Sequence, residues 1–162
     1  MRAGTRIGRP ALRRRLAEAL DEGALILVAP AGSGKTMALE EALDDRGGAV
    51  AWVKCRAEHA DGSRLLDRLV EVLRTAAPGT ADVLGDTLAL AIAPIDVASS
   101  ARQLAAELER LVVDPLAIVF DDAEHLAESE GAGAILSALL VSDAVPLRVA
   151  VASRRSLPLR VA

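Results

Sequence analysis

Aromatic residues and cysteines are scarce in this sequence. Aromatic side chains account for 1% of its 162 residues, so the chain offers no stacked aromatic platform for single-stranded nucleic acid. Cys55 is the only cysteine. An intramolecular disulfide is therefore excluded, which is compatible with a reducing compartment.

Long apolar runs and a strong excess of positive charge are also missing. No segment approaches the length that spans a bilayer, and the basic N-terminus is not followed by the apolar core of a signal peptide. The net charge is −4 and the pI is near 5.2, which argues against a dedicated nucleic-acid binder. We interpret the basic cluster as a solvated helix face; its members are Arg2, Arg6, Arg9, Arg13, Arg14 and Arg15. We expect a cytoplasmic protein that contacts neither membrane nor nucleic acid directly.

What is present is a pattern of alternating strands and helices. Apolar residues make up 52% of the chain and charged residues 26%, typical of one globular domain over residues 1–162. The expected strands are short apolar runs at 24–29, 49–53, 116–120 and 148–153. The expected helices begin near residues 10, 35, 63, 100 and 135, with a poorly defined one within 80–95. This alternation predicts an α/β fold with a mostly parallel sheet covered on both faces, possibly lacking its last strand.

Helix ends can be predicted at three places. Gly23 is expected to stop the first helix. Either Asp61 or Ser63 caps the third, and both remain open. Ser100 and Gln103 have the spacing of a capping box, which predicts that a helix begins there.

The most informative segment reads Ala-Pro-Ala-Gly-Ser-Gly-Lys-Thr at 29–36. It follows an apolar strand and precedes a helix, which is the context of a phosphate-binding P-loop. The usual first glycine is replaced by Ala29, a tolerable change if that position needs smallness more than positive φ. Gly32 and Gly34 let the backbone curl so that amide groups point at phosphate oxygens. Lys35 should reach the β- and γ-phosphates, and Thr36 should coordinate Mg²⁺.

Two aspartates follow the apolar run at 116–120, in the manner of a Walker B strand. We expect that strand to lie next to the P-loop strand, with Asp121 serving Mg²⁺. Asp122 would polarise an attacking water; the alternative is that both carboxylates only cap the next helix. Either Arg154 or Arg155, directly after the fourth strand, could contact a γ-phosphate, unless both are ordinary surface arginines.

Other residues argue against a guanine-binding site and against a histidine metal site. The chain contains no asparagine, so the Asn-Lys-x-Asp pattern with which GTPases read guanine is absent and adenine is favoured. The two histidines lie far apart in sequence and do not form a metal pair. Cys55 and Trp52 are interpreted as core residues rather than ligand contacts.

These motifs together resemble the nucleotide-binding domain of STAND-class P-loop ATPases, specifically MalT-like, LuxR-type transcriptional regulators. The resemblance rests on five stretches: Arg9-Pro10, the P-loop, Val50-Ala-Trp52, Ile118-to-Asp122 and Ala152-Ser-Arg154. It implies that Arg9 and Pro10 lie against adenine and that Arg154, rather than Arg155, contacts the γ-phosphate. It divides the chain into an adenine-side helix at 1–22 and a P-loop core at 23–162.

The resemblance also implies a switch that binds ATP with Mg²⁺, hydrolyses it weakly or slowly, and self-associates or contacts neighbouring domains of a longer regulator. The expected catalytic residues are Lys35, Asp122 and Arg154. The expected nucleotide contacts are Arg9, Pro10, Ala31, Gly32, Ser33, Gly34, Lys35, Thr36 and Met37, and the expected Mg²⁺ ligands are Thr36 and Asp121. Two alternatives stay open: a small-molecule kinase on the same scaffold, and an interaction module that binds no nucleotide.

Overall fold

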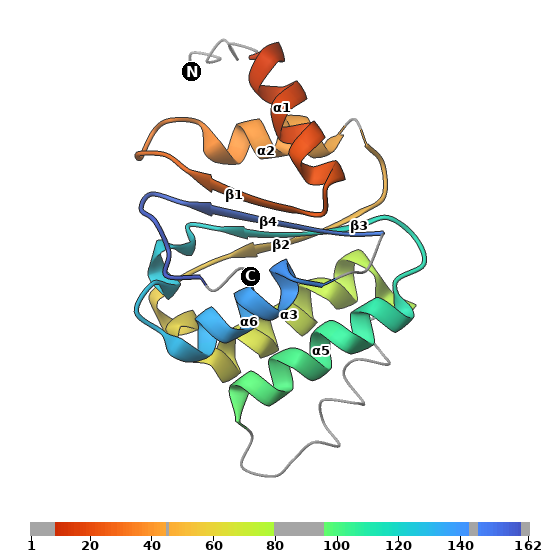
Figure 1. The fold of residues 1–162 in the computed structure, drawn as a ribbon, viewed down its shortest axis with the longest axis vertical. Helices are drawn as coiled ribbons and strands as arrows, with labels where there is room; N and C mark the ends of the chain where they lie inside the picture. Colours follow the sequence, from red (N-terminus) through yellow and green to blue (C-terminus); the bar gives the residue numbers. More distant parts are fainter. Residues whose placement is uncertain (1–8, 45, 80–95, 143–145, 160–162) are drawn as a thin grey trace.

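The computed structural model describes residues 9–44, 46–79, 96–142 and 146–159. Arg2, Arg6 and the helix expected within 80–95 lie outside these residues. The described part is a three-layer α/β sandwich (Figure 1). Its strands are β1 (Ala24–Val28), β2 (Ala49–Lys54), β3 (Leu116–Asp121) and β4 (Leu147–Ser153). The predicted fold class is confirmed.

The sheet is parallel throughout, in the order β1-β4-β3-β2. β3 and β4 occupy the middle, and every residue of β3 is buried, as an uninterrupted apolar run predicts for a strand covered on both faces. β1 lies at one edge of the described sheet, where Ile26 and Val28 are 41% and 45% exposed. A sheet of four described strands, open beside β1, agrees with the expectation that a last strand could be missing.

Two layers of helices cover the sheet. α1 (Pro10–Asp21) and α2 (Lys35–Asp44) lie on one face, and α3 (Gly62–Ala76), α5 (Val97–Leu111) and α6 (Glu130–Leu140) lie on the other (Figure 1). Two short 3₁₀ turns, η1 (Ala57–Ala60) and η2 (Ala123–Leu126), follow β2 and β3.

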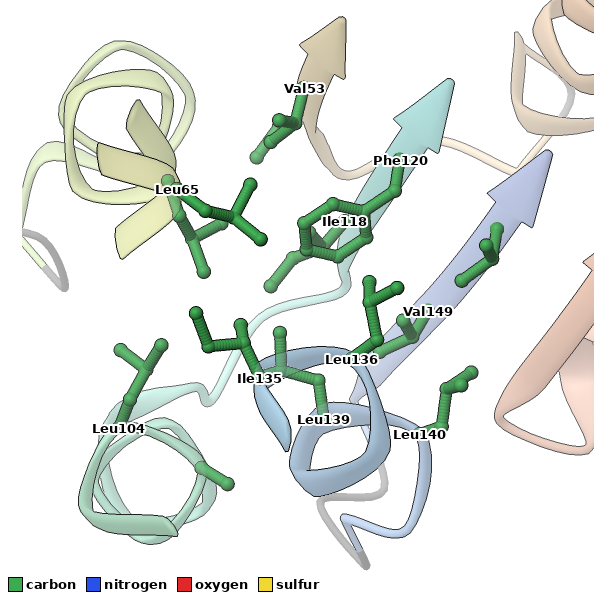
Figure 2. Packing of buried hydrophobic residues seen from close by; sticks show 14 of the residues in the cluster. Val53, Leu65, Leu104, Ile118, Phe120, Ile135, Leu136, Leu139, Leu140 and Val149 are labelled. Carbon is green, nitrogen blue, oxygen red and sulfur yellow. The ribbon is translucent and has the colours of Figure 1, made fainter. Parts of the chain in front are cut away.

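The larger core lies between the sheet and the three-helix layer. Figure 2 shows Ile118 and Phe120 of β3 pointing into it, towards leucines and isoleucines of the covering helices. Phe120 is fully buried, which fixes the strand that ends in Asp121. The second core, on the opposite face, packs Leu16 and Leu20 of α1 and Leu39 of α2 against alternate strand residues.

The helix ends test the capping predictions. α1 ends at Asp21, and Gly23 follows with a φ of +106°, as expected of a glycine stop. Asp61, not Ser63, caps α3, because its carboxylate accepts the amides of Ser63 and Arg64.

The capping box expected at Ser100 is wrong. α5 begins one turn earlier, at Val97, and its cap is Asp96, whose side chain accepts the amide of Ala98 and the hydroxyl of Ser99. Ser100 lies inside the helix and is buried. The carboxylate of Asp96 accepts two hydrogen bonds at the start of the helix and so caps it. Ser100 is buried by tertiary packing inside the helix and does not act as the cap.

Candidate active site at the carboxyl end of the sheet

The P-loop forms the turn between β1 and α2. Gly32 and Gly34 have φ angles of +73° and +80°, a backbone region that glycine enters without steric cost. Ala29 has no positive φ, since Asp122 is the only described non-glycine residue that does. Alanine is therefore compatible with the first position of the loop. α2 begins at Lys35, and the amides of its first turn, which have no partner within the helix, point back into the loop.

Lys35 folds back over this loop. Its Nζ donates to the carbonyl oxygens of Ala29 at 2.7 Å and Pro30 at 3.0 Å, and the residue is only 8% exposed. Among the described residues, the hydrogen-bond partners of this buried ammonium are carbonyl oxygens, which carry no counter-charge. An anion in the loop would supply that charge.

Thr36 links the P-loop to the end of β3. Its Oγ1 donates to Oδ2 of Asp121 at 2.9 Å, and Asp121 is 1% exposed. The expectation that β3 lies next to the P-loop strand is wrong, because β4 runs between β1 and β3. The aspartate still reaches the loop because all the strands are parallel and end at one edge.

Asp122 leaves the strand in a left-handed conformation, with a φ of 54°. Its amide donates to Oδ1 of Asp121 at 3.0 Å. The Asp121 carboxylate reaches Thr36 of the P-loop, and both carboxylates lie within ion-pair distance of Lys54 at the end of β2. Asp122 makes no side-chain cap to the following η2 turn, so the alternative that it only caps the next helix is not supported.

Lys54, at the end of β2, is a site residue that our sequence analysis missed. Its Nζ lies 2.6 Å from Oδ2 of Asp122 and 3.1 Å from Oδ2 of Asp121. The hydrogen bond that Lys54 donates to Asp122 raises the pKa of Lys54, and the same bond lowers the pKa of Asp122. The sequence offered one signal: a lysine at the carboxyl end of a strand, where the functional groups of such sheets gather.

The two arginines after β4 take different partners. Arg154 lies 2.8 Å from Oε1 of Glu124 through its Nε and 3.7 Å from Oδ1 of Asp122 through its guanidinium. Arg155 instead reaches the carbonyl oxygen of Glu124 and, at 3.6 Å, the carboxylate of Glu128. Only Arg154 therefore lies beside the aspartates. Glu124, the second residue that sequence reasoning missed, holds it there by also accepting its amide at 3.0 Å.

A pocket of about 240 Å³ adjoins the P-loop on its α1 side. Arg9, Gly32, Ser33, Gly34 and Met37 are among the residues that line it. The guanidinium of Arg9 donates to the carbonyl oxygen of Ser33 at 3.2 Å, joining the start of α1 to the loop. Two further expected contacts, Pro10 and Ala31, are exposed and do not line the pocket.

These residues fit a phosphate with a bound divalent cation. Ser33 carries a buried Oγ without a hydrogen-bond partner in the described part of the chain, an atom that a phosphate oxygen would satisfy. No group of three or more His, Cys, Asp or Glu side chains among the described residues could hold a metal by itself. Mg²⁺ commonly binds through one or two protein oxygens together with substrate phosphates, and Thr36 and Asp121 offer such a pair.

The two residues that we interpreted as core residues, Cys55 and Trp52, lie in or against the core. Cys55 is 2% exposed, and burial raises the pKa of its thiol to about 12. Trp52 packs against the core on the α1 side. His59 is buried, with its Nδ1 accepting the amide of Arg56, whereas His125 is exposed. In the segments that the structure describes, none of the helices is long and apolar enough to traverse a membrane.

Two solved structures resemble the fold. The Walker-type ATPase PABY2304 of Pyrococcus abyssi shares 20% identity and a TM-score of 0.54, over 94% of this chain and 47% of that one. The ORC1 protein of Aeropyrum pernix, solved in complex with DNA, shares 19% identity and a TM-score of 0.54, over 90% of this chain and 38% of that one. This chain thus spans about half or less of either protein. No curated protein matches the sequence.

Residues 7–157 match the AAA domain family. The match includes the P-loop, both aspartates and Arg154, and it extends over all four described strands. The chain therefore belongs to the AAA domain family.

Proposed function

We propose that this domain binds ATP with Mg²⁺ and hydrolyses it slowly, as the switch module of a transcriptional regulator. One observation carries the proposal: Thr36 of the P-loop and Asp121 of β3 are hydrogen-bonded at 2.9 Å, across 85 residues of sequence. This contact brings a phosphate loop and a metal-binding carboxylate to one point. Arg154 lies close enough to the second aspartate to complete the site.

Each part of the nucleotide would meet a particular group. The P-loop amides and Lys35 would hold the β- and γ-phosphates, and Thr36 with Asp121 would hold Mg²⁺. The pocket between Arg9 and Met37 would take the adenine side. When bound, the metal neutralises charge that develops on the phosphates.

Hydrolysis would depend on Asp122 and Arg154. The carboxylate of Asp122 is only partly exposed, at 20%, and its lowered pKa keeps it ionised and able to orient a water. A carboxylate with a lowered pKa is a weaker base, which supports slow turnover. Arg154 would contact the γ-phosphate and so distinguish ATP from ADP.

The regulatory role rests on the resemblance to MalT-like, LuxR-type regulators. A ligand shifts a two-state protein only if it contacts the two states differently. ATP and ADP differ by the γ-phosphate, which Arg154 and Asp122 would contact. We place the module in the cytoplasm and expect it to act through self-association or neighbouring domains of a longer chain.

A small-molecule kinase remains the second candidate, because a charged pocket of about 580 Å³ adjoins Lys54 beyond the aspartates. Arg56, Arg64 and Arg68 are among its lining residues and could hold an anionic acceptor. Phosphate released from ATP in the absence of any acceptor would favour the ATPase.

The test is a titration of the purified chain with fluorescent ATP, ADP and GTP, with and without Mg²⁺. We expect ATP and ADP to bind and GTP to bind more weakly. Lys35→Ala should weaken ATP binding at least about tenfold, the loss expected when a charged phosphate contact is removed. Unchanged binding in that variant would overturn both the ATPase and the kinase.

A matched pair of variants tests the arginine. Arg154→Ala should reduce the preference for ATP over ADP, whereas Arg155→Ala, one residue away, should leave it intact. Equal losses in the two variants would contradict the role given to Arg154.

A further inference from the structure

Lys54 holds a position for which the proposed phosphate chemistry has no use. It is the last residue of β2 and is paired in register with Asp121 on β3. Its Nζ contacts both aspartates, at 2.6 Å and 3.1 Å. The register of the sheet thus places an ammonium directly between the two carboxylates.

The contact with Asp121 involves the oxygen that would serve the metal. Oδ2 of Asp121 accepts both Thr36 Oγ1, at 2.9 Å, and Lys54 Nζ, at 3.1 Å. The other oxygen, Oδ1, accepts the amide of Asp122. Within the segments that the structure describes, the hydrogen bonds of this buried carboxylate are therefore all internal. A divalent cation held by Thr36 and Asp121 would lie within a few ångströms of the ammonium and be repelled by it.

We propose that Lys54 is an internal counter-ion of Asp121 and Asp122 that Mg²⁺ must displace, so that it sets the Mg²⁺ concentration at which the site loads. This inference rests on the proposed function for its setting, because it assumes that the Thr36–Asp121 pair receives the metal. It adds a residue that controls loading without binding the phosphates.

Lys54 lies next to open space into which its side chain could move when Mg²⁺ displaces it. It is 52% exposed and also lines the charged pocket of about 580 Å³ beyond the aspartates. Three carboxylates and three arginines line the same pocket, so the ammonium would leave the aspartates mainly for water. Release therefore needs a change of side-chain rotamer and no movement of β2.

The first experiment measures how strongly Mg²⁺ and nucleotide binding are coupled. Fluorescent ATP is titrated into wild type and Lys54→Met over a range of Mg²⁺ concentrations. We expect the half-saturating Mg²⁺ concentration to fall about tenfold in the variant, because one unit charge close to the metal has been removed. Lys54→Arg, which keeps the charge, should resemble wild type.

Arg56→Gln is the matched control. It removes one positive charge two residues along the chain from Lys54. In the described part of the chain, the ion pair of Arg56 is with Glu58, at 3.9 Å, and not with either aspartate. The control variant should leave the Mg²⁺ dependence nearly unchanged. An equal shift in Arg56→Gln and Lys54→Met would show a general charge effect and overturn the proposal. An unchanged or increased Mg²⁺ requirement in Lys54→Met would also overturn it.

A second experiment omits the nucleotide. Mn²⁺ is titrated into each variant and free Mn²⁺ is followed by electron paramagnetic resonance. Lys54→Met should bind Mn²⁺ more tightly than wild type, and equal binding would contradict the competition. If wild type binds no ATP at any Mg²⁺ concentration, the proposed function fails while the Mn²⁺ titration still decides the role of Lys54. Should Lys54→Met not fold, judged by circular dichroism, Lys54→Gln serves in both experiments.

Discussion

Gly48, in the turn before β2, is expected to tolerate no side chain. Its φ is +90°, and a Cβ built there would lie 2.4 Å from the carbonyl oxygen of Pro115 and 2.9 Å from the Cβ of Pro115. That carbonyl cannot move away easily, because it accepts the amide of Ala49 at 2.9 Å, where β2 meets β3. Gly47 has a φ of +66° and nothing within 4 Å of such a Cβ, so Gly47→Ala is a matched control for Gly48→Ala.

The two substitutions share their backbone cost. An alanine in left-handed geometry costs about 1–2 kcal/mol, partly offset by about 0.4–1 kcal/mol because alanine restricts the unfolded chain. Only Gly48→Ala adds a steric overlap, comparable to overpacking at about 1–3 kcal/mol. We expect Gly47→Ala to lower the free energy of unfolding by about 1 kcal/mol. Gly48→Ala should lower it by about 2–4 kcal/mol.

Urea unfolding followed by Trp52 fluorescence is the assay. Trp52 is the only tryptophan and lies on β2, so its signal reports on the affected strand directly. The slope of free energy against urea should stay the same, with only the midpoint shifting. Equal midpoints for the two variants would refute the steric reasoning, because closeness to Pro115 is what separates the two positions.

Three further outcomes are expected from single side chains. Asp61→Ala should lower the free energy of unfolding by about 1 kcal/mol through loss of the α3 cap, while Ser63→Ala should not; urea midpoints decide between them. Burial lowers the pKa of His59 below 6.5, so the unfolded chain binds the proton more readily than the folded chain does. The stabilisation that is present above pH 6.5 is therefore lost as the pH falls through the pKa of His59 in the folded chain. His59→Gln should flatten that part of the stability profile, and an unchanged slope would contradict this role. Cys55, with its thiol pKa raised to about 12, should resist iodoacetamide in the folded protein and react in urea. Labelling is measured by mass spectrometry, and rapid labelling of the folded protein would contradict the burial of Cys55.

Much of the site was predictable because its signals are local. Gly32 and Gly34 predict a turn with positive φ, which the structure has. The apolar run before Asp121 predicts a strand buried on both faces, and every residue of that strand is buried. Parallel strands end at one edge, so the sequence also predicted that Thr36, Asp121 and Arg154 would approach one another. The capping box at Ser100 failed because its spacing is satisfied by many short stretches, while burial of Ser100 depends on tertiary packing.

The sequence by itself determined the phosphate loop, the four strands and the carboxylates at the end of β3, since each depends on a few neighbouring residues and on backbone chemistry. Only the tertiary structure decided that β4 separates the P-loop strand from the Asp121 strand, because strand order reflects packing between distant segments. It alone placed Lys54 between the two aspartates and Glu124 against Arg154. These ion pairs join side chains on separate segments of the chain, and no local pattern encodes which charges will meet.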